Sequence, residues 1–427
     1  LAIALLLYLP SKKRFTMTNP YPEKLYHNLL VGVVEVLHQI FNEQQQAERV
    51  VEHALKTHAK WGANDRRFVA QIVYDMVRNW RLIHTIVQFD ELPSLTYADL
   101  WTMVGVWLSI QKVLLPPWEE WRDVPSQADI WSSYQQLAAQ REYAYSLPEW
   151  LDSYGVAQLG ADKWEAEVAA MHQPTHVHIR VNTLQTTKAK LMAELAREGI
   201  EALPVAWSKY ALQLEGRKNL MSLKSYKKGD FEIQDAASQL IAPYLSPQPN
   251  MTVIDACAGA GGKTLHLAAL MQNKGHLVAM DTVEWKLEKL QQRADRNGAT
   301  IIRTQAIVSP QNIIRQHHTA DRLLLDVPCS GSGTLRRKPD LKWRMTAESL
   351  PLLQQTQQHI LQNYTPMLKK GGLFVYATCS IFPVENEQQI RTFLAENPNY
   401  NLLKEQHIFP SQYPTDGFYM ACLQRNS

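Results

Sequence analysis

Two cysteines occupy equivalent positions at the ends of two apolar segments. Cys329 follows LLLDVP at 323–328, and Cys379 follows LFVYAT at 373–378. Both segments are typical of buried strands, and in one parallel sheet their following residues would meet at the carboxyl edge, where open sheets bind ligands. A single buried cysteine is ordinarily an inert small hydrophobe. Two thiols at one ligand-binding edge indicate covalent chemistry instead.

One reaction that needs such thiols is methylation of a cytosine ring at carbon-5. That carbon becomes nucleophilic only after a thiolate adds to carbon-6. Asp326, three residues before Cys329, is placed to hold a proton at ring nitrogen-3 while charge builds on the ring. A second thiol would help the attacking thiol leave carbon-6 after the methyl transfer. The chemistry alone does not decide which cysteine attacks.

A glycine-rich turn follows an earlier strand and opens a helix. This turn, DACAGAGGKT at 255–264, has glycines that let backbone amides approach a ligand closely. It lacks the spacing of a Walker loop and the order of a dinucleotide fingerprint, and a tight structural turn is the alternative. We expect the cofactor to contact its residues Cys257, Ala258, Gly259, Ala260, Gly261, Gly262 and Lys263, together with Asp326.

Asp281 ends the next strand, where a carboxylate can accept both hydroxyls of a ribose. This position suits S-adenosylmethionine as well as NAD. The alternative is that Asp281 only caps the following helix.

A basic run after the Cys329 strand is the best candidate for RNA contact. Cations would bind phosphates there, and a tryptophan ring would stack on an unpaired base. The alternative is a solvated loop. The residues expected to bind RNA are Arg336, Arg337, Lys338, Lys342, Trp343 and Arg344, with Arg180 from an earlier strand.

The elements that carry these residues fall into three predicted parts. Residues 17–145 have helical apolar spacing, including a helix at 65–74 capped by Asn64. Residues 146–246 read as a small α+β module that recognises RNA, and residues 247–427 alternate strands and helices as a mostly parallel α/β domain does. A long helix is expected to run through Leu353 and Leu368 and to end at Gly371-Gly372.

The balance of charge differs between the two halves of the chain. The chain has 427 residues and a net charge of +3, with basic and acidic residues numbering 11 and 16 in 17–150 but 30 and 25 in 151–427. A mildly basic second half suits a polyanion without proving one. Arginines on the predicted helices, at 66, 67, 78 and 81, would contact RNA or simply form a solvated face.

The four cysteines have neither zinc spacing nor a disulfide framework, so we expect no metal site and a reduced, cytoplasmic location. The opening LAIALLLYLP is too short to span a membrane, and we expect residues 1–16 to be an extension outside the fold. A monomer that does not bind membranes is expected.

Three ordered motifs resemble the Nop/Sun family of RNA cytosine-5 methyltransferases. They are DACAGAGGKT at 255–264, LLLDVPCSGSGTLRRKPDLKW at 323–343 and YATCSIFPVENEQQI at 376–390, preceded by IRVNTL at 179–184 and FEIQDAASQL at 231–240. The resemblance implies a Rossmann-like class I methyltransferase domain that uses S-adenosylmethionine. It also implies that Cys379 is the nucleophile and that Cys329 assists product release.

The helical region around NDRRFVAQIVYDMVRNWR resembles the NusB-like, RNA-binding domain of the bacterial family branch that acts on small-subunit ribosomal RNA. Ribosomal RNA is therefore the expected substrate. Alternatives are a transfer RNA cytosine-5 methyltransferase, a methyltransferase acting on DNA or an amine, and a non-catalytic RNA-binding factor for ribosome assembly.

Two positions depart from the family pattern. The first motif has Gly259-Ala260 where the family usually has Ala-Pro, which relaxes the loop without removing its amides. The family's aspartate near the adenine end has no counterpart in 301–314, where Gln305 is nearest by spacing. We therefore expect Gln305 to contact the adenine.

Overall fold

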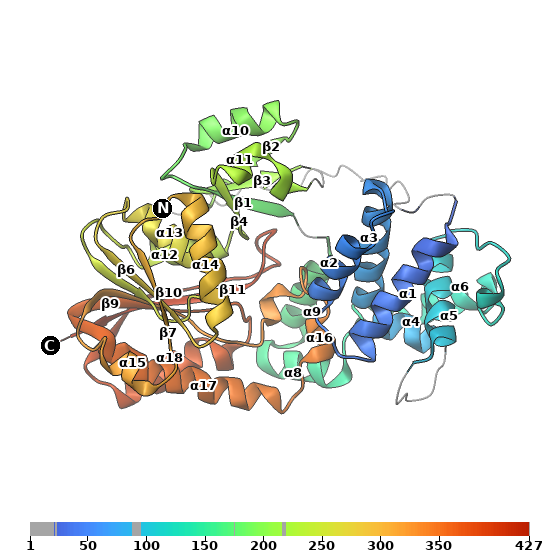
Figure 1. Ribbon diagram of the computed structural model, residues 1–427. Coiled ribbons are helices and arrows are strands. Elements are labelled where there is room, and N and C mark those ends of the chain that lie inside the picture. Colours follow the sequence, from blue (N-terminus) through green and yellow to red (C-terminus); the bar gives the residue numbers. More distant parts are fainter. Residues whose placement is uncertain (1–20, 22–23, 88–94, 175, 216–218, 427) are drawn as a thin grey trace. The chain divides into compact units, whose positions relative to one another are not determined.

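The computed structural model describes residues 21, 24–87, 95–174, 176–215 and 219–426, which belong to two compact units, Leu1–Ser146 and Leu147–Ser427 (Figure 1). The predicted extension, residues 1–16, lies outside the described residues. The predicted boundary near 246 falls within the second unit and stays a prediction.

The described part of the first unit is helical. Helix α5 is its centre, because every residue from Leu100 to Ile110 is buried against α1, α4 or α6 and their connections. Helix α3 begins one residue before Asn64, and Asp65 accepts the Gly62 N–H at 2.8 Å, so the prediction that Asn64 caps this helix is wrong. The elements are α1 (His27–Phe41), α2 (Ala47–Thr57), α3 (Ala63–Arg78), α4 (Trp80–Val87), α5 (Tyr97–Ile110), η1 (Glu119–Trp121), α6 (Gln127–Leu137) and α7 (Arg141–Ala144).

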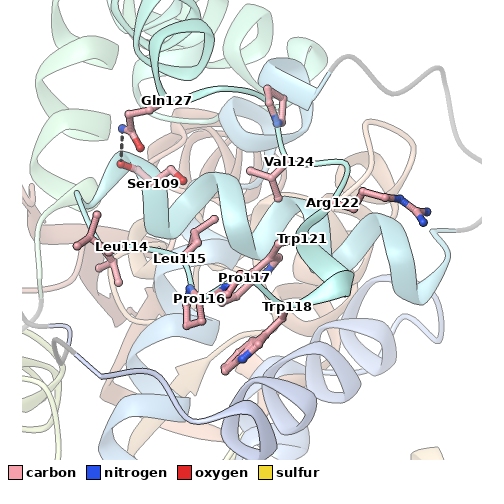
Figure 2. Close-up of a pocket in the computed structure, with 12 residues that line it drawn as sticks. Ser109, Leu114, Leu115, Pro116, Pro117, Trp118, Trp121, Arg122, Val124 and Gln127 are labelled. Atoms are coloured by element: carbon pink, nitrogen blue, oxygen red, sulfur yellow. Dashed lines mark hydrogen bonds between the residues drawn. The ribbon is translucent and has the colours of Figure 1, made fainter.

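A pocket of about 510 Å³ lies beside α5 and η1 (Figure 2). The rings of Trp118 and Trp121 stack in its wall with centroids 4.8 Å apart. Gly105 makes room for this packing, because an added Cβ would lie 2.6 Å from Val124 and 3.1 Å from Trp121. Val124 and Trp121, which line the pocket, therefore occupy the space that a side chain at position 105 of α5 would need.

The second unit begins with two helices and a small antiparallel sheet. The sheet order is β2-β3-β1-β4, and α10 and α11 cover it with a core that includes Leu191, Leu195 and Phe231. Its elements are α8 (Glu149–Leu159), α9 (Ala161–His172), β1 (Val177–Val181), α10 (Lys188–Arg197), β2 (Ala202–Pro204), β3 (Ala211–Leu214), η2 (Leu220–Ser222), α11 (Lys224–Lys227) and β4 (Phe231–Ile233).

The rest of this unit is a seven-stranded sheet in the order β10-β11-β9-β8-β5-β6-β7. The five strands from β9 to β7 are parallel, β11 pairs antiparallel with β9, and β10 pairs antiparallel with β11. The strands are β5 (Thr252–Asp255), β6 (His276–Asp281), β7 (Ile302–Ala306), β8 (Ala320–Asp326), β9 (Leu368–Thr378), β10 (Tyr400–Ile408) and β11 (Phe418–Arg425). The predicted Rossmann-like α/β fold is confirmed.

Alternating side chains of these strands build one core on each face of the sheet. Val253 and Leu324 pack beneath α12, α13 and α14, whereas Ile254 and Leu323 pack beneath α15, α17 and α18. The helices and short turns are α12 (Ser238–Tyr244), α13 (Gly262–Leu270), α14 (Glu284–Asn297), α15 (Pro310–Ile314), η3 (Ser332–Thr334), α16 (Leu341–Arg344), α17 (Ser349–Tyr364), η4 (Thr365–Met367), η5 (Pro383–Glu385) and α18 (Glu387–Glu396).

The long helix ends earlier than the sequence predicts. Helix α17 stops at Tyr364, a short turn at Thr365–Met367 follows, and Gly371-Gly372 lies within β9. Pro366 explains the early end, because proline lacks the N–H that continues a helix. Among the described helices, none has the length and apolarity needed to cross a membrane.

The chain order creates a switch point in the sheet. It runs outward from β5 through β6 to β7, then returns to the other side of β5 to form β8 and β9. Loops after β5 and β8 therefore diverge, and open α/β sheets bind ligands in the crevice that results. The predicted cofactor turn and Cys329 follow the two strands that border this point, and Cys379 follows β9, the next strand after β8.

Candidate active site

The two cysteines lie together at the carboxyl edge of the sheet. Strands β8 and β9 are parallel neighbours, with Asp326 opposite Ala377, so the segments that follow them run side by side. The Sγ atoms of Cys329 and Cys379 are 3.3 Å apart, and the Cys379 N–H also donates to Cys329 Sγ at 3.3 Å. Both residues are half-buried. The site thus combines two reduced thiols that remain partly accessible.

The two thiols differ in environment. The hydrogen bond to Cys379, followed by burial, raises the pKa of Cys329 well above its usual value. Cys329 therefore keeps its proton near neutral pH and can donate it toward Cys379 Sγ.

Lys263 and Asp326 form an ion pair beside the thiols. Lys263 Nζ lies 2.6 Å from Asp326 Oδ2 and 5.5 Å from the centre of the Phe418 ring. Burial would lower the pKa of Lys263, but Asp326 and, more weakly, Cys379 raise it above its ordinary value. A charged ammonium therefore lies close enough to the sulfur of Cys379 for the two groups to interact electrostatically.

The glycine-rich turn needs its glycines for backbone conformation. Gly259 and Gly261 have φ values of +53° and +87°, in the left-handed region that favours glycine. An added Cβ on Gly261 would lie 2.4 Å from Leu290, whereas one on Gly259 meets no atom within 4 Å. The turn therefore packs closely against α14 at Gly261 and faces open space at Gly259.

Asp281 lies at the end of β6 and holds this turn from the side. Its Oδ2 accepts the Gly259 N–H at 2.8 Å, and its Oδ1 accepts the Val283 N–H at 2.9 Å. Each carboxylate oxygen has two acceptor sites, so Asp281 retains capacity for ligand hydroxyls.

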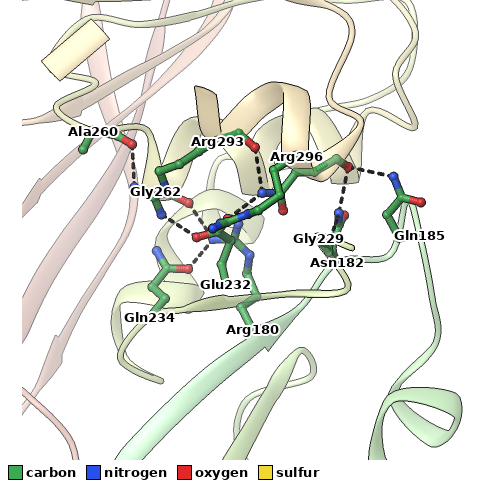
Figure 3. Close-up of polar contacts among 11 residues, drawn as sticks. Arg180, Asn182, Gln185, Gly229, Glu232, Gln234, Ala260, Gly262, Arg293 and Arg296 are labelled. Carbon is green, nitrogen blue, oxygen red and sulfur yellow. Dashed lines mark hydrogen bonds and ion pairs between the residues drawn. The ribbon is translucent and has the colours of Figure 1, made fainter. Parts of the chain in front are cut away.

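A largely buried network of charged side chains forms hydrogen bonds to two carbonyl oxygens of the turn (Figure 3). Arg180 donates to Gly262 O at 2.5 Å, and Arg293 donates to Ala260 O at 2.5 Å. Glu232 accepts from Arg293 at 2.7 Å and also pairs with Arg296. Burial would raise the pKa of Glu232, but Arg293 and Arg296 hold it below its ordinary value. The small sheet, which carries Arg180 and Glu232, is thus bonded to the turn.

Arg180 was expected to contact RNA, and the structure gives it another place. Its side chain is buried, bonds Gln234 as well as Gly262, and burial lowers its pKa to about 9. A guanidinium enclosed in this way cannot meet a phosphate without leaving the core. The prediction of RNA contact is therefore wrong for Arg180 in this conformation.

The predicted basic run divides into buried and accessible members. Arg336 is buried and donates twice to Ala170 O, at 3.1 and 2.6 Å, while Lys342 is buried with its ammonium 5.3 Å from the Trp343 ring centre. These two side chains support the loop instead of presenting charge to solvent.

The other members of the run remain at least partly accessible. Lys338 is exposed and Trp343 is half-buried. Arg337 pairs with Asp235 at 2.9 Å and Asp416 at 3.0 Å, and Arg344 pairs with Asp340 at 3.2 Å. Lys338 is thus the member of the run that best fits the predicted role in RNA binding.

Gln305 lies on β7, and its amide already has partners. Its Nε2 donates to Asn312 O at 3.4 Å, and its Oε1 accepts from Gln316 at 3.1 Å. A contact between Gln305 and an adenine stays a prediction.

The sequence did not single out Glu385 or Glu232, although both lie in motifs that resemble the family. Glutamates near turns are ordinarily exposed, and nothing in their spacing indicates burial. In the structure both are almost fully buried and bonded to residues of the site. No group of three His, Cys, Asp or Glu residues placed to hold a metal occurs in the described ranges.

Comparison with known proteins identifies relatives along most of the chain. Residues 242–424 match the family described as 16S rRNA methyltransferase RsmB/F, and residues 147–221 match the ferredoxin-like domain of RsmF/B-like methyltransferases. A probable ribosomal RNA small subunit methyltransferase B from Synechocystis sp. is 28% identical, over 91% of this chain and 98% of the relative.

Two further relatives support this match. The probable ribosomal RNA small subunit methyltransferase B of Bacillus subtilis is 32% identical over 71% of this chain and 70% of its own length. The solved structure of a methyltransferase homologue from Pyrococcus horikoshii is 27% identical, with a TM-score of 0.60 over 67% of this chain and 98% of that one.

Proposed function

The chain belongs to the RsmB/F family of 16S rRNA methyltransferases, and from that premise we propose that it methylates carbon-5 of a cytosine in small-subunit ribosomal RNA. S-adenosylmethionine is the proposed methyl donor. The observation that carries the proposal is the 3.3 Å approach of Cys329 and Cys379 Sγ atoms beside the ion pair of Lys263 and Asp326.

The residues around the turn fit such a donor. Open space faces Gly259, and Asp281 stands at the neighbouring strand end. The carboxylates of Asp281 and Asp326 make the surroundings of the turn acidic. Acidic surroundings suit a ligand that carries a sulfonium and an ammonium. When bound, S-adenosylmethionine supplies an electrophilic methyl group.

Cys379 attacks as a thiolate in the proposed reaction, with the charged Lys263 ammonium nearby. Its sulfur forms a bond to carbon-6, and the electrons of the carbon-5 to carbon-6 double bond move into the ring. Asp326 faces ring nitrogen-3 and, with Lys263, stabilises the proton and charge that develop there. Carbon-5 is then nucleophilic and takes the methyl group.

Release reverses the addition. A base in the site takes the carbon-5 proton, and the electrons of that carbon–hydrogen bond restore the double bond between carbon-5 and carbon-6. The carbon-6 to sulfur bond breaks, and its electrons stay on the sulfur of Cys379. Cys329 retains its proton because its pKa is raised by the hydrogen bond to Cys379 and by burial. Its thiol can therefore hydrogen-bond to the departing sulfur of Cys379 and assist release.

The target base must be outside a duplex for this chemistry, because a paired and stacked cytosine hides carbon-6. Exposed Lys338 and half-buried Trp343 are the proposed contacts to an unpaired segment.

The proposal is tested with the full chain, deproteinised 16S rRNA and S-adenosylmethionine, followed by bisulfite sequencing. We expect one or a few cytosines to become resistant to conversion in a reaction that requires Cys379. Methyl incorporation that bisulfite sequencing does not detect would assign the activity to another atom. An absence of incorporation into both naked RNA and small-subunit precursor particles would reject an enzymatic role.

A further inference from the structure

The residues that follow the two cysteines bond to the same carboxylate. Ser330 donates its N–H to Glu385 Oε1 at 2.8 Å and its hydroxyl to Oε2 at 2.5 Å. Ser380 donates its hydroxyl to the same Oε2 at 2.5 Å. One buried side chain thereby connects the Cys329 loop to the Cys379 loop.

Glu385 is placed to act only as an acceptor. It is 0% exposed, and Gln357 of α17 supplies a further N–H donor at 3.0 Å. Four donors thus converge on two oxygens, which matches the capacity of an ionised carboxylate. In the described ranges no lysine, arginine or histidine forms an ion pair with it, so hydrogen bonds alone stabilise its charge.

The same contacts extend to both sides of each cysteine. Gln357 also donates to Pro328 O at 3.0 Å, just before Cys329. Asn386, the neighbour of Glu385, bonds the Thr378 hydroxyl and donates to Ser380 O at 3.0 Å. The backbone around both thiols is therefore fixed by Glu385-Asn386 together with Gln357 of α17.

We propose that Glu385 is a positioning residue that sets the separation of the Cys329 and Cys379 sulfurs for attack and release. This inference rests on the proposed function for its catalytic consequence. A displacement of about 1 Å between reacting groups can slow a reaction by roughly a hundredfold. Two loops that share one carboxylate cannot separate without leaving a buried charge with unfilled acceptor sites, which is costly.

The charge of Glu385 has a second effect on the pair. After the Cys379 hydrogen bond and burial, the electrostatic effect of Glu385 also raises the pKa of Cys329. Removing the charge should therefore lower the pKa of Cys329.

Glu167 offers a matched control. It is also almost fully buried, and it accepts the N–H of one serine, Ser411, at 3.0 Å together with the hydroxyl of that serine. It lies on α9 and bonds no residue of either cysteine loop in these contacts. Glu167→Gln therefore alters a buried carboxyl group that bonds a serine in the same way, without releasing the thiols.

The test compares Glu385→Gln with Glu167→Gln in the full-length protein. The first readout is the rate at which diamide couples Cys329 to Cys379, followed by peptide mass analysis. The two thiols lose two electrons and two protons to diamide, so this rate reports their approach and needs no RNA. The second readout is single-turnover methyl transfer, and the third is the pH profile of Cys329 alkylation.

For Glu385→Gln we expect disulfide formation and methyl transfer to slow by roughly tenfold or more, and the Cys329 alkylation profile to move to lower pH. Glu167→Gln should keep both rates within about twofold of the unmodified protein. Glu385→Asp, which restores the charge on a shorter arm, should recover the pH profile but only part of the rates.

Equal rates in Glu385→Gln and Glu167→Gln would overturn the inference. Should Glu385→Gln fail to fold, Ser330→Ala removes one donor of the cluster and is expected to slow both processes several-fold. Unchanged rates in Ser330→Ala would then overturn it as well. A disulfide rate that depends on Glu385 in a protein without methyl transfer would reject the proposed function and leave the positioning role intact.

Discussion

The sulfur atoms of Cys329 and Cys379 lie 3.3 Å apart, although fifty residues separate them in the chain. The parallel pairing of β8 with β9 brings them together, because both residues follow the same end of adjacent strands. Their environments are unequal: Cys329 has a raised pKa, and Lys263 lies near Cys379. This asymmetry leads to different expectations for the two substitutions.

Cys379→Ala should abolish methyl transfer and the covalent adduct with RNA. The reason is that the sulfur of Cys379, which lies near the Lys263 ammonium, is the one proposed to add to carbon-6. The measurement is methyl incorporation into 16S rRNA, together with denaturing electrophoresis of the protein on 5-azacytosine RNA. Normal turnover by Cys379→Ala would refute the assignment of the nucleophile.

Cys329→Ala should instead accumulate the adduct. Attack by Cys379 remains possible, but the departing sulfur loses the thiol that lies 3.3 Å away. We expect a band of protein bound to ordinary cytosine RNA that survives denaturation and disappears in the double variant. If Cys329→Ala forms no adduct and Cys379→Ala does, the two roles are reversed, and Cys329, which follows Pro328, is the nucleophile.

Glu232→Gln should weaken cofactor binding although Glu232 does not reach the ligand side of the turn. The substitution leaves Arg293, which holds Ala260 O, without its paired anion. It also removes the negative charge that acts electrostatically on Arg180, which holds Gly262 O. We expect the dissociation constant for S-adenosylmethionine to rise by about tenfold, equivalent to about 1.4 kcal/mol. Isothermal titration of the purified protein measures it directly.

Glu198→Gln is the control for this experiment. Glu198 belongs to the same small module and accepts the N–H and hydroxyl of Ser225 at 3.0 and 3.1 Å. Its loss should reduce stability slightly and leave cofactor affinity within about twofold. Equal weakening by both variants would mean that general loosening of the module, and not the grip on the turn, explains the effect.

The part of the site that could be predicted from the sequence is the part that the parallel strands place at one edge of the sheet. Each of the segments that ends at Asp255, Asp281, Asp326 and Thr378 was recognisable as a strand, and parallel strands bring their following residues to one edge. The approach of Cys329 to Cys379 follows from that rule without any knowledge of side-chain contacts.

The sequence did not reveal which polar side chains are buried. Arg180 and Arg336 were grouped with Lys338 because all three are cations near the proposed cleft, yet the first two bond backbone carbonyls inside the fold. Glu385 was part of a recognised motif but had no assigned role, because its four donors come from three separate segments. Such convergence is a property of tertiary packing and leaves no local pattern.

Lys338→Ala and Arg336→Ala should separate RNA binding from stability. Lys338 is exposed, so its loss should weaken RNA binding several-fold and leave the thermal midpoint unchanged. The slope of log binding affinity against log salt concentration should become shallower by about one. Arg336→Ala should destabilise the protein by about 1–3 kcal/mol, because Ala170 O loses the two guanidinium donors of this buried side chain. Filter binding at several salt concentrations and thermal denaturation measure these effects, and the opposite pattern would contradict the placement of the two side chains.

Asp255→Asn should change how stability depends on pH. Burial raises the pKa of Asp255 from 3.8 to about 7, so the folded protein holds this proton more tightly than the unfolded chain. The associated stability is complete below about pH 4 and is lost as pH rises through 7, at about 1.4 kcal/mol for each unit of pKa difference.

The asparagine side chain would stay neutral and still accept the Thr264 hydroxyl, which lies 2.7 Å from the carboxylate. Relative to the unmodified protein, the variant should therefore gain stability between about pH 5 and pH 8, as measured by denaturant unfolding at both values. Parallel pH profiles for the two proteins would show that Asp255 is already ionised in the fold and that Lys263 offsets the cost of its burial.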